Sequence, residues 1–241
     1  MSAKSDKYEK DMAKNINNIP GVKATRPAVA TSFPDVLVEY KQQKVWFEVK
    51  MNHTDNLSNP RVFYTNGKWH TTYSTPAAKY TVDLLNSSTQ TEKFLKDLAK
   101  FSGIPFKQLK IPTTKTGLKE PGAVPLKVMK LYFSQPSINR YIAGESNYNL
   151  GKVVTEHYTI GKEQPAYYMQ AGDDFYMISK TNPFGLSTKI PVLAGTGDFK
   201  VRVATRSEYY EVQAEIKISK MPYSEYSLMP GTKKKNPFLK Y

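Results

Sequence analysis

The chain has 241 residues and no cysteine, and 35 Lys and Arg against 21 Asp and Glu leave a net charge of +14. The lack of cysteine excludes disulfide scaffolds, thiolate zinc sites and cysteine nucleophiles. The first residues are polar and charged, unlike a secretion signal, and the sequence has no run of about eighteen consecutive apolar residues that could span a membrane. We therefore expect a soluble, cytoplasmic protein with no membrane partner. The positive charge favours a nucleic acid as partner, against the alternative of a generally basic surface.

The first predicted elements are a helix and two hairpins. Tyr8, Met12 and Ile16 recur every four residues and predict a helix over residues 5–17. VLVEY and KVWFEVKM, within residues 36–51, alternate around a Lys-Gln-Gln connection and predict a hairpin. A second hairpin is expected over residues 61–73, because Asn66-Gly67 is a favoured type I′ turn.

The rest of the chain is predicted to be helical at first and then mostly β. Pro76 opens a helical region to about residue 101, with a break at the Asn-Ser-Ser-Thr run. Residues 104–126 hold four prolines and indicate a long connection. We expect a strand at 126–133, short helices within 137–162, a turn at Gly172 and two long strands in 198–219. The tail after Lys220 is expected to be loosely ordered.

The first hairpin carries the residues that suggest chemistry. A period of two puts Glu48 and Lys50 on one face of their strand. A turn at 41–43 would place Glu48 opposite Val36 and close to Asp35, and such neighbours lie about 5 to 8 Å apart. Two carboxylates at that separation can bind one Mg²⁺, which keeps waters and shares its sphere with a phosphate.

Lys50 supplies the third part of this candidate site. Its amine could orient or help deprotonate an attacking water and stabilise charge on phosphorus. Together these residues predict phosphodiester hydrolysis. The alternative is an ordinary hairpin whose exposed face carries a Glu-Lys pair. A second Glu-x-Lys at Glu215 and Lys217 lacks a Pro-Asp pair and a preceding Glu helix, and is expected to be a solvated strand end.

The order Pro34-Asp35, strand, turn, Glu48-Val49-Lys50 resembles the PD-(D/E)XK nuclease superfamily, and its layout is closest to that of Holliday junction resolvases. The resemblance implies an α/β (α+β) fold: a restriction-endonuclease-like core with a mixed central sheet flanked by helices, plus a β-rich C-terminal extension. The core would be residues 1–103, followed by a linker or excursion at 104–126 and the extension at 127–241.

The resemblance also implies an activity and a set of site residues. It implies a Mg²⁺-dependent endodeoxyribonuclease that accepts Mn²⁺, acts on DNA and works as a homodimer. The implied catalytic residues are Asp35, Glu48 and Lys50, with Glu9 from the first helix. The implied metal ligands are Asp35, Glu48, Val49 and Glu9, and Ser32 matches a hydroxyl residue that precedes the Asp in archaeal resolvases.

Ser32 and several residues that follow the strand end are candidates for DNA contacts. Asn52, His53 and Arg61 follow the strand and could position a phosphate, or could cap a turn. Lys68 and Trp69 on the second hairpin could contact DNA, although aromatic hairpins also simply pack. Two other functions remain open: a non-catalytic DNA-binding or virion structural protein, and a nuclease directed at junctions or RNA.

Overall fold

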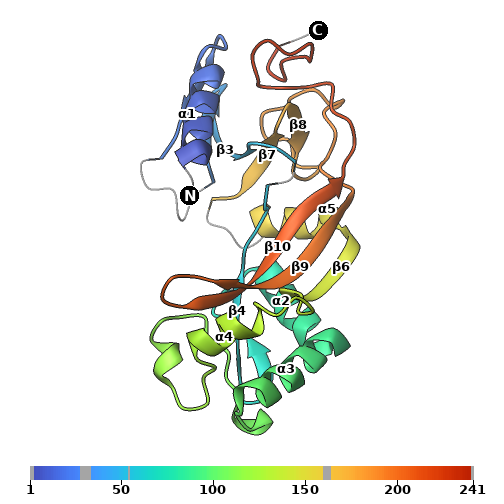
Figure 1. The fold of residues 1–241 in the computed structure, drawn as a ribbon. Coiled ribbons are helices and arrows are strands. Elements are labelled where there is room, and N and C mark those ends of the chain that lie inside the picture. The colour runs from blue at the N-terminus through green and yellow to red at the C-terminus, as the bar shows by residue number, and fades with distance from the viewer. Residues whose placement is uncertain (1–2, 28–33, 54, 160–163, 240–241) are drawn as a thin grey trace. The chain divides into compact units, whose positions relative to one another are not determined.

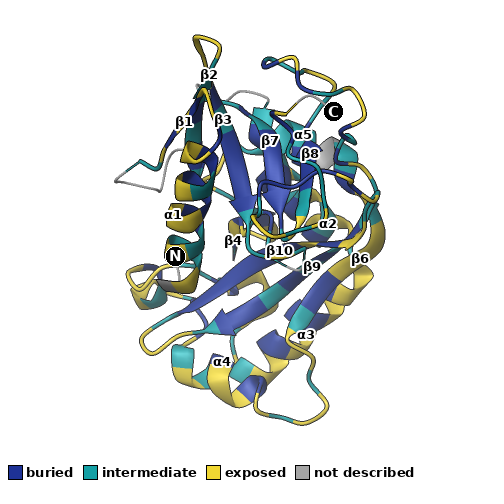
Figure 2. Ribbon diagram, turned by 90° about the horizontal axis from the view of Figure 1, so that it is seen from above, coloured by how far each residue is buried: buried dark blue, intermediate teal, exposed yellow. Residues whose placement is uncertain are grey.

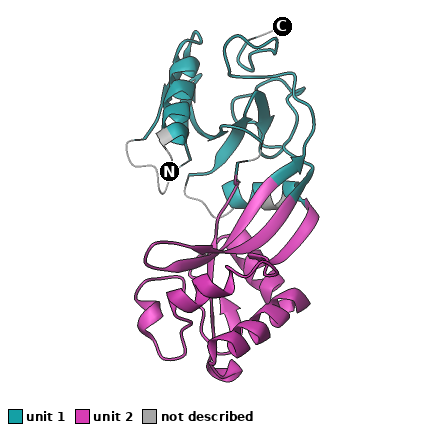
Figure 3. Cartoon of the chain, viewed as in Figure 1, with its two compact units in different colours: residues 1–55, 149–197, 218–241 teal, residues 56–148, 198–217 magenta. Residues whose placement is uncertain are grey.

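The computed structural model describes residues 3–27, 34–53, 55–159 and 164–239. The chain forms two compact units (Figure 3). The first combines Met1–Asp55, Asn149–Gly197 and Ile218–Tyr241, and the second combines Asn56–Tyr148 and Asp198–Lys217. Within the described residues, no helix has the length and apolar character needed to cross a bilayer.

The first unit is built on a five-stranded mixed sheet with the order β1-β2-β3-β7-β8 (Figure 1). Neighbouring strands are antiparallel except β3 and β7, which run parallel. Helix α1 contacts β1 and β3, and α5 contacts β7. The elements are α1 (Ala3–Asn17), β1 (Val22–Thr25), β2 (Val36–Tyr40), β3 (Gln43–Lys50), α5 (Leu150–Thr159), β7 (Ala166–Ala171) and β8 (Asp174–Met177). The prediction of an α/β fold with a mixed sheet flanked by helices is confirmed.

The apolar residues that recur every four positions form the buried face of helix α1. Met12 and Ile16 are buried in the core of the first unit, and Tyr8 packs against it. Asn17 ends the helix and ties it to β1, because its side chain accepts a hydrogen bond from the backbone N–H of Ala24 and donates one to the Ala24 carbonyl. The predicted helix is confirmed. Strand β1, only four residues long, was not predicted.

The first hairpin forms where it was predicted, with a register one residue different. Lys41 and Gln42 both adopt positive φ, of 49° and 65°, and form the tight turn. Val36 therefore pairs with Phe47 rather than with Glu48. The shift brings Asp35, the residue before the strand, level with Glu48. Val45, Phe47 and Val49 point into the core, as the alternation predicts.

Strand β3 is the centre of this sheet, and its second neighbour was not predicted. From Phe47 to Lys50 it pairs in parallel with Tyr168 to Ala171 of β7. A parallel pair needs a crossover connection, and here that connection is the chain between residues 50 and 166, which includes most of the second unit. The compact units therefore do not follow the boundaries at 103 and 126 expected from sequence.

The second unit contains β4 to β6, α2 to α4 and most of β9 and β10. Its strands belong to a sheet with the order β5-β4-β10-β9-β6. The elements are β4 (Arg61–Thr65), β5 (Lys68–His70), α2 (Pro76–Ser87), α3 (Thr89–Ser102), the 3₁₀ helices Phe106–Gln108 and Gly117–Lys119, α4 (Leu126–Tyr132), β6 (Tyr141–Asn149), β9 (Thr196–Thr205) and β10 (Tyr210–Lys220).

Local signals explain most of these elements. The turn at Asn66-Gly67 is confirmed, with positive φ at both residues. The break between α2 and α3 is also confirmed, because Ser88 ends α2 and accepts a hydrogen bond from the N–H of Thr91 at the start of α3. The strand predicted at 126–133 is wrong. This segment is helix α4, in which Met129 and Tyr132, three residues apart, are buried on one side.

The tail after Lys220 is part of the core, which corrects the prediction of a loosely ordered end. Tyr226, Leu228 and Phe238 are buried in the first unit. The carbonyl of Tyr226 accepts a hydrogen bond from the N–H of Phe175, and the N–H of Leu228 donates to the Gln170 side chain. Figure 2 shows that β7, in the same unit, is buried along most of its length, and β3 is buried mainly in its second half. The tail therefore contributes apolar side chains to this core.

Two leucines of the tail test its contribution to stability. Leu228 is 4% exposed and Leu239 is 48% exposed. We expect Leu228→Ala to lower the free energy of unfolding by about 2 to 5 kcal/mol, because it leaves a cavity. Leu239→Ala should change it by less than about 0.5 kcal/mol. Denaturant unfolding followed by circular dichroism measures both. Equal effects would contradict the placement of the tail in the core.

Candidate active site

Asp35, Glu48 and Lys50 meet at one end of the β2–β3 hairpin, in the first unit. Oδ2 of Asp35 accepts a hydrogen bond of 2.8 Å from the backbone N–H of Val49. The Nζ of Lys50 lies 2.5 Å from Oε1 of Glu48, and these side chains are only 18% and 8% exposed. The structure therefore brings the three predicted catalytic residues into one largely buried cluster.

Burial and neighbouring negative charge dominate the electrostatics of Asp35. Burial first, and then the charges of Glu48 and Glu9, raise the pKa of Asp35 to about 8, against the opposing effects of Lys50 and the Val49 N–H. One lysine thus does not balance the carboxylates at this place. A divalent cation is the kind of charge that would let Asp35 ionise at neutral pH.

Lys50 and Tyr158 surround Glu48. Burial alone would lower the pKa of Lys50, but Glu48, Tyr158 and Asp35 together hold it well above its usual value, so the amine stays charged. The Tyr158 hydroxyl donates a hydrogen bond to Glu48, and burial and the Glu48 charge raise the pKa of this phenol. Tyr158 was not predicted. The one sequence signal is that Leu150, Val154 and Tyr158 recur every four residues in α5 and are all buried.

Glu9 lies close to this cluster and already has a cationic partner. It is 3% exposed, and its Oε2 accepts a hydrogen bond of 2.9 Å from Nε of Arg26. Arg26 also pairs with Asp6 at 2.6 Å. The charge of Glu9 reaches Asp35, because it contributes to the raised pKa of Asp35. Helix α1 thus places Glu9 beside the site, with its carboxylate paired to Arg26.

The donor set for a metal ion is small. Within the part of the chain that the structure describes, no group of three or more His, Asp or Glu side chains could hold a metal ion. Asp35 and Glu48 remain as a pair. Proteins often bind Mg²⁺ through one or two carboxylates, with waters and substrate phosphates filling the other positions. The pair fits that pattern. Val49 as a ligand stays a prediction, and Ser32 lies outside the described residues.

The other residues predicted after β3 are engaged in local contacts. The backbone N–H of Asn52 donates to the Asp55 carboxylate in the turn that follows the strand. Nε2 of His53 lies 3.0 Å from Oδ2 of Asp174, and Nζ of Lys234 lies 2.5 Å from the other oxygen of Asp174. His53 is therefore held by a carboxylate of β8, and its role in DNA binding stays a prediction.

The candidates on β4 and β5 belong to the second unit. Trp69 is 2% exposed and its ring packs against Tyr64, with centroids 5.3 Å apart, so it is a core residue and does not present a surface to DNA. This corrects the expectation for Trp69. Nε of Arg61 lies 2.7 Å from Oε2 of Glu211, whereas Lys68 is exposed. Arg61 thus neutralises a buried carboxylate of its own unit.

The second Glu-x-Lys motif is part of that unit and has a different environment. Oε1 of Glu215 lies 2.7 Å from Nε of Arg202, and its other oxygen accepts a hydrogen bond from the Tyr141 hydroxyl. Glu215 is buried, whereas a solvated strand end was expected. Lys217 is exposed. The arginine already balances the charge of Glu215.

Comparison with known proteins identifies no family. No family model matches the chain, and no curated protein matches it. Among solved structures, the chain is similar to HhaI endonuclease in complex with DNA, at 12% identity and a TM-score of 0.29, over 90% of this chain and 87% of that one.

The raised pKa of Asp35 predicts a stability that depends on pH. Between about pH 4 and 8 the folded state keeps a proton on Asp35 that the unfolded state has lost, so this group stabilises the fold less as pH rises. Asp35→Asn removes this effect. We subtract the free energy of unfolding of Asp35→Asn from that of the wild type, both measured in EDTA. This difference should fall from pH 4 to pH 8 by on the order of a few kcal/mol.

A matched control is Glu39→Gln, which changes a carboxyl that is 45% exposed in β2. Its stability should follow that of the wild type across the same pH range. Thermal melts in buffers of constant ionic strength make the comparison. A constant difference between wild type and Asp35→Asn from pH 4 to 8 would show that Asp35 is not protonated in the folded state.

Proposed function

We propose that the first unit carries a metal-dependent nuclease site that hydrolyses phosphodiester bonds of DNA, with Asp35 and Glu48 as ligands of Mg²⁺ and Lys50 beside them. The observation that carries the proposal is the burial of these two carboxylates and one ammonium in a single cluster at the end of β3. Burying charged groups is costly, and a buried cluster of titratable side chains with a strongly shifted pKa is typical of functional sites. The chain's +14 charge supports a polyanionic substrate.

The residues of this site would have distinct tasks. A bound divalent cation would supply Lewis-acid chemistry and a more acidic water. The Val49 N–H orients the Asp35 carboxylate, and the Tyr158 hydroxyl orients that of Glu48. The amine of Lys50 stays protonated in this environment. We therefore assign Lys50 to stabilising negative charge on the phosphoryl oxygens, rather than to taking a proton from water.

Plasmid cleavage tests the proposal directly. Supercoiled plasmid should be nicked or cut with Mg²⁺ or Mn²⁺ and should stay intact in EDTA. Asp35→Asn, Glu48→Gln and Lys50→Ala should each lower the rate by about 100-fold or more, because each removes a ligand or a charge next to the reacting phosphate. Lys217→Ala is the control, since Lys217 is the exposed lysine of the other Glu-x-Lys motif. Full activity of Glu48→Gln would rule out this site.

One observation favours a second candidate function. Lys50 already pairs with Glu48, and no three-residue metal group occurs in the described parts of the chain. A DNA-binding protein without catalysis would keep Glu48 paired with Lys50 in this way. It would bind DNA with a steep dependence on salt and would leave plasmid, four-way junctions, single strands and RNA uncut with every divalent ion. A nuclease directed at junctions or RNA would cut only its own substrate in that panel.

Double-strand cleavage would require two such sites, and a homodimer would provide them. Sedimentation of the protein with and without duplex DNA tests this part of the proposal. A monomer that only nicks plasmid would contradict the dimer and leave the site assignment intact.

A further inference from the structure

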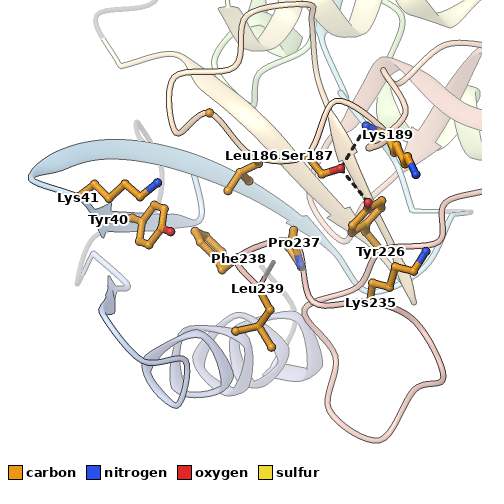
Figure 4. Close-up of a pocket in the computed structure, with 11 residues that line it drawn as sticks. Tyr40, Lys41, Leu186, Ser187, Lys189, Tyr226, Lys235, Pro237, Phe238 and Leu239 are labelled. Carbon is orange, nitrogen blue, oxygen red and sulfur yellow. Dashed lines mark hydrogen bonds between the residues drawn. The ribbon is translucent and has the colours of Figure 1, made fainter. Parts of the chain in front are cut away.

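A second candidate binding site lies at the other end of the hairpin, in the first unit. It is a cavity of 540 Å³, which is within the range of about 300 to 1,000 Å³ typical of small-molecule sites. The cavity is lined by the turn of the β2–β3 hairpin, the segment 185–189 and the C-terminal tail (Figure 4). We call it the lysine pocket. Its lining residues are Tyr40, Lys41, Gly185, Leu186, Ser187, Lys189, Tyr226, Lys235, Pro237, Phe238 and Leu239.

Among the described residues that line the lysine pocket, every charged side chain is positive. These side chains are Lys41, Lys189 and Lys235, and no carboxylate is among the described lining residues. Glu225 pairs with Lys235 at 2.8 Å, and the charges of Lys235 and Lys189 both lower the pKa of Glu225. Glu225, an exposed carboxylate, thus interacts with two of these lysines. An anion in the pocket would meet an excess of positive charge.

The lysines stand at two ends of an apolar floor. Figure 4 shows Lys41 beside Tyr40 at one end, and Lys189 and Lys235 near Tyr226 at the other. Between them lie Leu186, Phe238 and Leu239. The ammonium of Lys41 lies 5.0 Å from the centre of the Tyr40 ring, within the range of a cation–π contact. The floor is apolar and partly aromatic, and each end is cationic.

Side-chain contacts within the protein fix the floor and walls of the pocket. Phe238 is 8% exposed, and its ring lies 5.1 Å from that of Tyr40 in an edge-to-face contact. The hydroxyls of Ser187 and Tyr226 bond to each other at 2.8 Å. The first contact holds the tail against the hairpin and the second holds it against the segment 185–189, so the pocket does not need a ligand to form its walls. Such preorganisation lowers the cost of binding.

We propose that the lysine pocket binds one unpaired nucleotide of a DNA strand, with its base on the apolar floor and its two flanking phosphates at Lys41 and at Lys189 with Lys235. A nucleotide within a strand has a phosphate on each side of its sugar and a flat, partly apolar base. This arrangement matches a floor with cations at both ends. The choice of DNA among phosphorylated aromatic ligands rests on the proposed nuclease function.

Binding of small probes in EDTA tests the proposal without cleavage. Thymidine 3′,5′-bisphosphate should bind about tenfold more tightly than thymidine 5′-monophosphate, because it has a phosphate for each end. Thymidine alone should bind more weakly still. Affinity for the bisphosphate should fall as salt rises. Isothermal titration calorimetry measures these affinities. Equal affinity for phosphotyrosine and for the bisphosphate would overturn the assignment to a nucleotide.

Three lysine variants locate the binding site. Lys41→Asn and Lys189→Gln should each weaken bisphosphate binding about fivefold or more, and Asn suits the positive φ at position 41. Lys44→Gln is the matched control, because Lys44 is close in sequence, 65% exposed, and does not line the pocket. Unchanged affinity in both Lys41→Asn and Lys189→Gln would overturn the proposal, as would the absence of bisphosphate binding by the wild type.

Two further measurements complete the test. The first distinguishes a single strand from a duplex as the source of the nucleotide, and the second distinguishes the lysine-pocket proposal from the nuclease proposal. A short oligo-dT should compete with the bisphosphate, whereas a blunt duplex, whose bases are stacked and paired, should not. Stronger competition by the duplex would overturn the choice of an unpaired nucleotide. Glu48→Gln should bind the bisphosphate as the wild type does. Cleavage without nucleotide binding refutes only the lysine pocket, and nucleotide binding without cleavage refutes only the nuclease site.

Discussion

The parallel pairing of β3 with β7 is the constraint on which the first unit depends. Strand β3 has β2 on one side and β7 on the other, so its backbone is paired along both edges and Glu48 can be buried between them. The crossover that the pairing requires returns through α5 immediately before β7. That return puts Tyr158 against Glu48. The same pairing therefore builds the centre of the sheet and supplies one wall of the candidate active site.

Charge balance explains why the site is tightly organised. The cluster holds Asp35, Glu48 and Lys50, and Arg26 is paired with Glu9 close by. Each carboxylate except Asp35 has an ammonium or guanidinium against it, and Asp35 has a backbone N–H. Its pKa is raised first by burial and then by the charge of Glu48, and Lys50 and the Val49 N–H offset this only in part. In the second unit, Glu211 and Glu215 are also buried, but each is paired with an arginine. Burial of a carboxylate alone therefore does not mark a reactive site.

Local sequence predicted the elements with strong local signals. The hairpin with Glu48 and Lys50 on one face, the helix that carries Glu9 and the Asn66-Gly67 turn all follow from periodicity or turn chemistry. Long-range pairing could not be predicted in this way. Nothing in residues 43–50 indicates that β7, more than 100 residues later, is their neighbour. Helix α4 was missed because a short segment with mixed spacing fits either period, and Tyr158 was missed because only the crossover brings it to Glu48.

The C-terminal tail links the stability of the first unit to the lysine pocket. Phe238 contributes to the aromatic core around Phe47 and also to the pocket floor. Gln170 of β7 accepts a hydrogen bond from Leu228, so the tail is attached to the same strand that completes the centre of the sheet. A ligand that binds only the folded pocket stabilises the fold in proportion to its concentration. Occupancy of the pocket would therefore stabilise the packing of the tail on the sheet. It would also stabilise the hairpin whose far end carries Asp35 and Glu48.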